Sequence, residues 1–183
     1  MIDLTVMAAA AKNATRQMAH SSTDAKNIAL KAIANNLEQS QNDILSANEK
    51  DINEALKNGL NSALIDRLTL TPKRLDAMAA DVINIASLPD PIGERFDSKV
   101  LENGLQIERQ RVPIGVLGVI YESRPNVTID VTALAIKTGN VVLLRGGSET
   151  MHSNRVLVNL VQQALRYANL PESSVQFIDD SDR

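Results

Sequence analysis

Two short polar turns hold the residue types of this sequence that are best suited to chemistry. One is Arg145-Gly-Gly-Ser148, which follows an apolar run at 140–144. The other is Tyr121-Glu-Ser-Arg-Pro-Asn126, which follows an apolar run at 114–121. A glycine turn after a buried strand lets backbone N–H groups close on an anion, and a neighbouring cation strengthens that site. The Arg145 turn therefore predicts a nucleotide phosphate site.

The Arg145 turn has three interpretations. A guanidinium, two backbone amides and a hydroxyl lie within four residues, which suits a ribose 2′-phosphate. An acidic residue is the usual partner of a free ribose diol, and Glu149 is adjacent. A plain turn from strand to helix, capped by Ser148 or Thr150, is the third. The residue types by themselves leave all three open.

Asn126 and Arg124 are the polar groups of the other turn. Asn126 can cap the helix that follows, which its position favours, or its amide can donate to a developing oxyanion. Arg124 suits a substrate carboxylate or phosphate, although an ion pair with Glu122 would also account for it. Ligands of open α/β domains bind at this edge of the sheet.

The elements that must position these turns alternate between strand and helix. The run at 114–121 lacks polar alternation, which predicts a strand buried on both faces of a parallel sheet. Helical spacing follows at 127–137 and from about 153 to 168, with further strands expected at 141–144 and 175–178. This order is the start of a doubly wound α/β domain.

Residues 1–88 show helical periodicity throughout. Ser21 is expected to begin one helix and Thr71 another, and Gly59 has the position of a left-handed helix end. The charged residues of the third helix are most simply its solvated face; they are Glu49, Lys50, Asp51 and Glu54.

The period changes to two between Val100 and Val112, around the turn Asn103-Gly104. This pattern predicts an exposed hairpin. The hairpin either pairs with another subunit through its edge or is a solvated linker.

Composition excludes several functional classes. The 183 residues are 44% apolar with a net charge of −3, and only 2% are aromatic, which argues against a nucleic-acid partner. No signal peptide or membrane span is expected, so the cytoplasm is the default location. The two histidines lack metal-ligand spacing, and the absence of cysteine excludes a thiol nucleophile within this chain.

The segments VPIGVLGVIYESRPNVT and KTGNVVLLRGGSET resemble the gamma-glutamyl phosphate reductase family, a branch of the aldehyde dehydrogenase superfamily. NGLNSALIDRLTLTPKRLDAMAADV and LPDPIG extend the resemblance over essentially the whole chain. It implies reduction of L-glutamyl 5-phosphate by NADPH to L-glutamate 5-semialdehyde in proline biosynthesis, through a cysteine thiolate.

The resemblance also implies roles for individual residues. Asn126 would be catalytic, as the group that stabilises the oxyanion, and Arg124 would bind substrate. The expected cofactor-binding residues are Tyr121, Pro125, Arg145, Gly146, Gly147 and Ser148, with no metal site.

The implied organisation has three parts. Residues 1–98 form the helical part of the cofactor domain, residues 99–112 a hairpin arm for homo-oligomer formation, and residues 113–183 a partial Rossmann-like NADP-binding domain. The family's nucleophilic cysteine lies beyond the stretch present here, so the chain is interpreted as an amino-terminal fragment that is inactive by itself. The alternatives are a noncatalytic interaction module and another acyl-reducing member of the superfamily.

Overall fold

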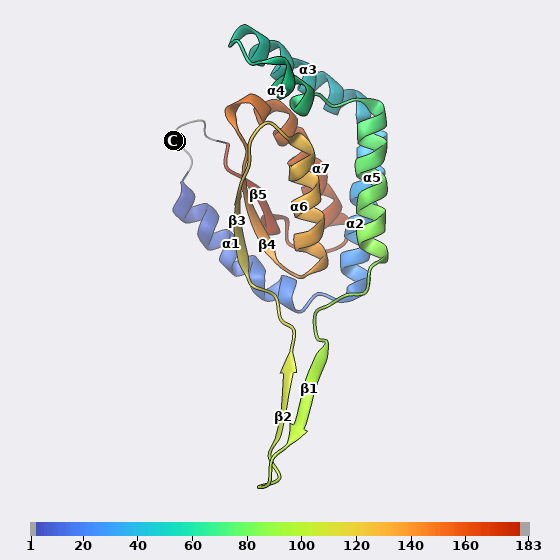
Figure 1. Ribbon diagram of the computed structural model, residues 1–183, viewed down its shortest axis with the longest axis vertical. Coiled ribbons are helices and arrows are strands. Elements are labelled where there is room, and N and C mark those ends of the chain that lie inside the picture. Colours follow the sequence, from blue (N-terminus) through green and yellow to red (C-terminus); the bar gives the residue numbers. More distant parts are fainter. Residues whose placement is uncertain (1–2, 180–183) are drawn as a thin grey trace.

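The computed structural model describes residues 3–179, which form a body of helices around a small parallel sheet and a long projecting hairpin (Figure 1). The elements, in chain order, are α1 Leu4–Ala19, α2 Thr23–Gln39, α3 Gln41–Lys57, α4 Ser62–Leu68, α5 Pro72–Ser87, β1 Arg95–Val100, β2 Gln106–Gln110, β3 Val116–Ile120, α6 Pro125–Lys137, β4 Val141–Arg145, a 3-10 turn at Ser148–Thr150, α7 Met151–Tyr167, a second 3-10 turn at Glu172–Ser174, and β5 Val175–Phe177.

The sheet is parallel, with the order β3-β4-β5. Helix α1 lies on one face, α6 and α7 lie on the other, and α2 and α5 form a further layer outside them (Figure 1). Strand, helix, strand, helix, strand is the order that the sequence predicts. The fold class, with an amino-terminal helical part, a hairpin and the first half of a parallel α/β sheet, is therefore confirmed.

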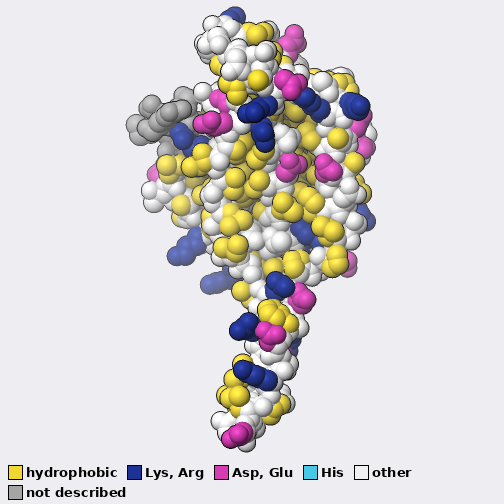
Figure 2. Space-filling view, viewed as in Figure 1, with side chains coloured by type: hydrophobic (Ala, Val, Ile, Leu, Met, Phe, Trp, Pro, Cys, Tyr) yellow, Lys and Arg dark blue, Asp and Glu magenta, His cyan; other side chains and the backbone are white. Residues whose placement is uncertain are grey.

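The centre of the sheet is β4, where Val141, Val142 and Leu144 are fully buried. The prediction that the first strand is buried on both faces is wrong for β3. This strand is at the edge of the three-stranded sheet, and Ile120 is 76% exposed. Figure 2 shows hydrophobic side chains gathered over the middle of the body on this side. Exposed residues alternate with half-buried ones along β3, so one face of this strand lacks the covering layer that burial on both faces requires.

The helix ends agree with the signals in the sequence, except that one cap lies one residue later and one short helix was not predicted. Ser22, rather than Ser21, caps α2 by accepting from the Ala25 N–H at 3.2 Å. Gly59 has the left-handed backbone expected of it, with φ +76°. The structure adds the short helix α4, capped by Asn61.

The hairpin of β1 and β2 is antiparallel, and all its strand residues are exposed. It begins at Arg95, earlier than the residue-100 start of the alternating pattern. Its root is held to the body by Asp90, which pairs with the buried ammonium of Lys26. Burial by itself would raise the pKa of Asp90, but hydrogen bonds from Lys26, Ile92 and Thr23 and the Lys26 charge hold that pKa below its usual value.

Asp51 corrects the expectation of a solvated face on α3, because its side chain is only 1% exposed. Its carboxylate accepts from the backbone N–H groups of His152 and Ser153, at 3.0 and 2.8 Å, and from the Ser153 hydroxyl at 2.6 Å. These donors lie in the first turn of α7, where N–H groups lack partners within the helix. Asp51 thereby fixes the helix that follows the Arg145 turn. Within residues 3–179, no helix has the length and apolar character needed to cross a membrane.

Asp51→Asn is expected to lower the free energy of unfolding of the chain by about 1–3 kcal/mol, because an amide NH2 then faces a buried donor. Urea unfolding followed by circular dichroism measures the change. Glu49→Gln, on the exposed side of the same helix, is the control and should change stability by less than about 0.5 kcal/mol. Equal stability of the two variants would contradict this role.

Candidate functional site

The two polar turns leave the same edge of the sheet at the same level. Ile120 pairs with Arg145 in the parallel register, and the Tyr121 N–H donates to the Arg145 carbonyl at 3.1 Å. The carboxyl ends of β3 and β4 therefore open into adjacent turns. Ligands of open α/β sheets bind at such an edge.

Glu149 joins the two turns directly. Its Oε1 accepts from the Ser123 N–H at 2.6 Å and from the Ser123 hydroxyl at 2.7 Å. Ser123 is 6% exposed and has φ +47°, a backbone conformation that is uncommon outside glycine. Because this carboxylate oxygen is engaged at the Tyr121 turn, the geometry favours a bridging role for Glu149 over contact with a ribose diol.

A buried chain of hydrogen bonds runs beneath the turns. Thr128 Oγ1 donates to Asn154 Oδ1 at 2.6 Å, Asn154 Nδ2 donates to Thr150 Oγ1 at 2.8 Å, and that hydroxyl donates to the Gly147 carbonyl at 2.9 Å. Since the Thr128 proton is used, the Tyr121 hydroxyl is the donor in its 2.5 Å contact with Thr128. Burial raises the pKa of Tyr121 to about 12. The Tyr121 hydroxyl is thus part of the support beneath the turns.

A side chain at either glycine of the Arg145 turn would meet hydrogen-bonded polar side chains, which would have to shift. A Cβ on Gly146 would lie 2.3 Å from Asn154 Nδ2, and a Cβ on Gly147 would lie 2.3 Å from a Glu149 carboxylate oxygen. Neither Ser148 nor Thr150 provides a side-chain cap in the described structure. In this turn Ser148 is exposed and Arg145 is half-buried.

Asn126 does not cap α6, contrary to the favoured expectation. Arg124 occupies the cap position without a side-chain cap hydrogen bond, and Pro125 begins the helix, so Asn126 lies in the first turn. The Asn126 amide donates to Asp130 Oδ2 at 3.0 Å, which leaves its second N–H for another acceptor. No ion pair joins Arg124 to Glu122 among the ion pairs of residues 3–179.

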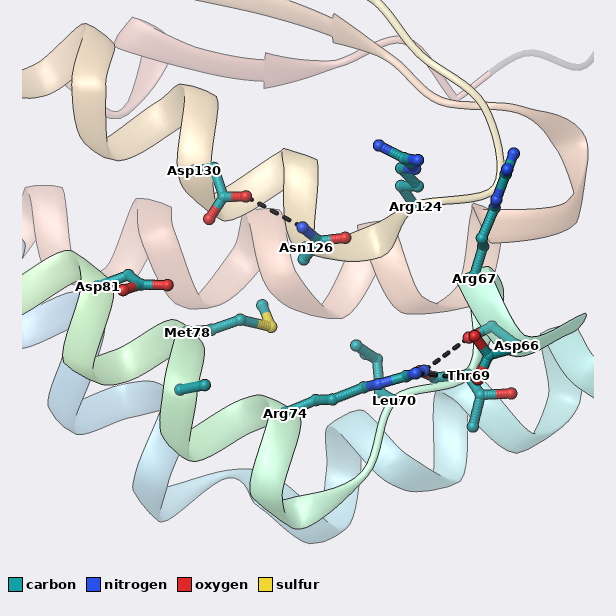
Figure 3. Close-up of a pocket in the computed structure, with 11 residues that line it drawn as sticks. Asp66, Arg67, Thr69, Leu70, Arg74, Met78, Asp81, Arg124, Asn126 and Asp130 are labelled. Carbon is teal, nitrogen blue, oxygen red and sulfur yellow. Dashed lines mark hydrogen bonds and ion pairs between the residues drawn. The ribbon is translucent and has the colours of Figure 1, made fainter. Parts of the chain in front are cut away.

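Asn126 and Arg124 line a pocket of about 380 Å³, between α4, α5 and the start of α6 (Figure 3). Its charged lining residues are Arg67, Arg74, Arg124, Asp66, Asp81 and Asp130. Figure 3 shows the side chains of Arg67 and Arg124 toward one end and Asp81 and Asp130 toward the other, with Asn126 between them. The volume is in the range of small-molecule sites.

Arg74 is committed to the wall of this pocket. Its guanidinium donates to the carbonyls of Asp66 and Thr69, each at 2.6 Å, and to the Asp66 carboxylate at 2.9 Å. Arg67 and Arg124 have no such partner among the described residues. The cationic end therefore keeps two arginines that can face an anionic ligand.

The opposite end is acidic. The pKa of Asp130 is raised above its usual value, mainly by burial and also by the charge of Asp81. The hydrogen bond from Asn126 acts in the opposite direction and lowers this pKa. Neither aspartate has a cationic partner within residues 3–179. Two carboxylates that line the same end of a pocket without a cation favour a bound cationic group.

Sequence reasoning identified the two turns but missed the other half of the pocket. Arg67 comes from α4 and Asp81 from α5, both far from the turns in sequence. Asp130 carried the one local signal, because it lies four residues after Asn126 and hence on the same helix face.

Comparison with known proteins places the chain in a defined group. Residues 3–183 match the family model described as the aldehyde dehydrogenase family. The chain is 55% identical to a gamma-glutamyl phosphate reductase of Actinobacillus succinogenes, over all of this chain and 44% of that relative. The crystal structure of gamma-glutamyl phosphate reductase from Thermotoga maritima has a TM-score of 0.96 at 44% identity, and covers all of this chain and 44% of that one. The corresponding structure from Saccharomyces cerevisiae has a TM-score of 0.93 at 30% identity, with 47% of that chain covered. The chain thus spans less than half the length of these relatives.

The Glu149 bridge makes a specific stability prediction. Glu149→Ala leaves the buried Ser123 N–H and hydroxyl without this acceptor, and should lower the free energy of unfolding by about 1–3 kcal/mol. Glu149→Gln keeps an acceptor oxygen and should cost less than about 1 kcal/mol. Urea unfolding of the chain compares them. Equal losses in the two variants would show that the hydrogen bonds to Ser123 are not what Glu149 contributes.

Proposed function

The chain belongs to the aldehyde dehydrogenase family, and we propose that it is the amino-terminal part of an NADPH-dependent reductase that converts L-glutamyl 5-phosphate to L-glutamate 5-semialdehyde. The similarity to gamma-glutamyl phosphate reductases, at 55% identity to one of them, supports this substrate. The observation that carries the proposal is the joining of the two turns at one sheet edge by the parallel register and the Glu149 bridge. One turn would hold the cofactor and the other the reacting acyl group.

The Arg145 turn fits the adenosine end of NADPH. Arg145 is the last residue of β4, and the exposed Ser148 hydroxyl follows it in the turn. Glu149 has a carboxylate oxygen engaged at Ser123. This donor set suits a 2′-phosphate better than a free diol. Gly146 and Gly147 would shape this cofactor turn through their close packing. Tyr121 and Pro125 would contribute by fixing the neighbouring turn.

Asn126 would serve the acyl end. Its amide is oriented by Asp130, and its second N–H can donate to the carbonyl oxygen as negative charge develops there. When bound, NADPH supplies the hydride that reduces the acyl group. Arg124, at the cationic end of the pocket, would bind an anionic group of the substrate.

The acyl acceptor would come from outside this sequence. The 183 residues contain no cysteine, whereas thiolate attack on an acyl phosphate releases phosphate and leaves a thioester that hydride can reduce to the aldehyde. We therefore expect residues 1–183 alone to show no reductase activity.

The hairpin would connect copies of the complete enzyme. Its strands are wholly exposed and keep free outer edges, and Phe96, Val100, Leu101, Leu105 and Ile107 are partly exposed apolar side chains on or beside them. Such an arm can add strands or apolar contacts to another subunit. A homo-oligomer formed through the arm is part of this proposal.

Activity can be tested in an extended protein, in which residues 1–183 are joined to the remaining segment of the Actinobacillus succinogenes relative. We expect it to oxidise NADPH when glutamyl phosphate is generated in situ, with release of phosphate. The relative itself is the positive control, and residues 1–183 alone should be inactive. A folded extended protein that shows no turnover with this substrate would refute the proposed reaction.

Arg145→Ala in the extended protein should raise the KM for NADPH on the order of 10- to 100-fold, because charge-assisted bonds to the 2′-phosphate are lost. The KM for NADH should change little. Arg166→Ala removes an exposed arginine that pairs with Glu172 at the far end of α7, and serves as the matched control. Equal losses for NADPH and NADH would show that Arg145 does not recognise the 2′-phosphate.

A further inference from the structure

The acidic end of the pocket has a chemistry that the proposed reaction leaves unused. Asp81 comes from α5 and Asp130 from α6, and both line the cavity that contains Asn126 (Figure 3). At the opposite end the pairing of Arg74 with Asp66 leaves Arg67 and Arg124 to face a ligand. The pocket is thus polar along its length, with positive charge at one end and negative charge at the other.

This separation of charge fits a ligand that carries both signs. A simple dianion would place one of its groups against two carboxylates, which is unfavourable. A ligand with an ammonium group would instead relieve the repulsion between Asp81 and Asp130. Lysine and arginine side chains do not perform this task among the described residues, because neither aspartate has an ion-pair partner there.

The spacing along α6 agrees with the proposed substrate. The Asp130 carboxylate lies 3.0 Å from the Asn126 amide nitrogen, so both groups can contact one short substrate. In an extended glutamyl chain the α-nitrogen is separated from the reacting carbonyl carbon by four bonds, or about 5 Å. An acyl oxygen held by the second N–H of Asn126 would leave the α-ammonium group within reach of the Asp130 carboxylate.

We propose that Asp130 and Asp81 bind the α-ammonium group of the substrate and make this pocket selective for an amino-acid acyl group over the same acyl group without the amine. The inference rests on the proposed function, since it takes the acyl group to lie at Asn126. Besides its proposed contact with the ammonium group, Asp130 accepts a hydrogen bond from the Asn126 amide. Asp81 accepts no hydrogen bond from that amide. The two aspartates therefore allow charge recognition to be separated from positioning of Asn126.

The test uses the extended protein in the reverse direction, in which an aldehyde is oxidised by NADP⁺ and phosphate accepts the acyl group. The substrates are L-glutamate 5-semialdehyde and 5-oxopentanoate, which is the same aldehyde without the amine. The measured quantity is the ratio of their kcat/KM values. Cyclisation of the amino aldehyde affects every variant equally, so it cancels when ratios are compared.

Asp81→Asn and Asp130→Asn should each lower the ratio on the order of 10-fold or more, through loss of activity on the amino substrate. Activity on 5-oxopentanoate should fall far less than activity on the amino aldehyde, because 5-oxopentanoate has no ammonium group that loses a partner. Asp130→Asn keeps an oxygen that can accept from Asn126, so it removes charge while preserving that acceptor. Asp76→Asn, an exposed aspartate of α5 outside the pocket lining, is the control and should leave the ratio unchanged.

The outcomes separate this inference from the proposed function. A wild-type extended protein that uses the amino aldehyde, with an unchanged ratio in both aspartate variants, would overturn ammonium recognition and leave the reductase proposal intact. Equal losses on both aldehydes would also overturn it, because they indicate a purely structural role. A folded wild-type protein that oxidises neither aldehyde, beside an active Actinobacillus succinogenes relative, would overturn the proposed function and this inference together.

Discussion

The parallel pairing of β3 with β4 is the constraint on which the site depends. Ile120 and Arg145 are register partners, so the chain leaves both strands at the same level and turns toward the same side. A slip of one residue would reverse which side chains face α1 and which face α6, and would separate the turns. Val141, Val142 and Leu144 are fully buried between the helix layers and anchor the strand that ends at Arg145. The chemistry of the turns therefore depends on the packing of an apolar strand.

Polar groups then convert this proximity into a defined geometry. Glu149 fastens one turn to the other through Ser123, and the chain from Tyr121 to Gly147 supports both from below. A buried polar network is stabilising only when its members have partners, and those named here do. The consequence for function is that hydrogen bonds hold the two turns in one arrangement relative to each other. A cofactor bound at one turn and an acyl group bound at the other would keep a fixed separation.

Helix α6 links this edge to the pocket. Pro125 begins the helix and Asn126 follows in its first turn, while Asp130 is on the same face one turn later. The remaining walls come from α4 and α5, which the buried residues Leu68, Leu75 and Met78 pack against the body. One short helix face thus carries both the amide suited to an oxyanion and a carboxylate suited to a cation. The positive charges of Arg67 and Arg124 lie at the other end of the pocket, which these two residues reach from different elements.

The sequence by itself determined the fold class, the two turns and the resemblance to a reductase family, because each is encoded by local patterns of apolar spacing, glycine and polar residues. The sequence did not predict that β3 is an exposed edge strand. An apolar run such as the one that contains Ile114 and Ile120 indicates that a strand can be buried, but not which elements cover it. Tertiary structure alone decided the partners of charged groups. Asp51 was expected on a solvated face and is instead the buried acceptor for α7. Glu149, for which contact with a ribose diol was one open alternative, bridges to Ser123. Hydrogen bonds between residues 26 or 102 positions apart depend on packing that no local pattern specifies. The charge-separated pocket has the same origin, because its two ends exist only where α4, α5 and α6 meet.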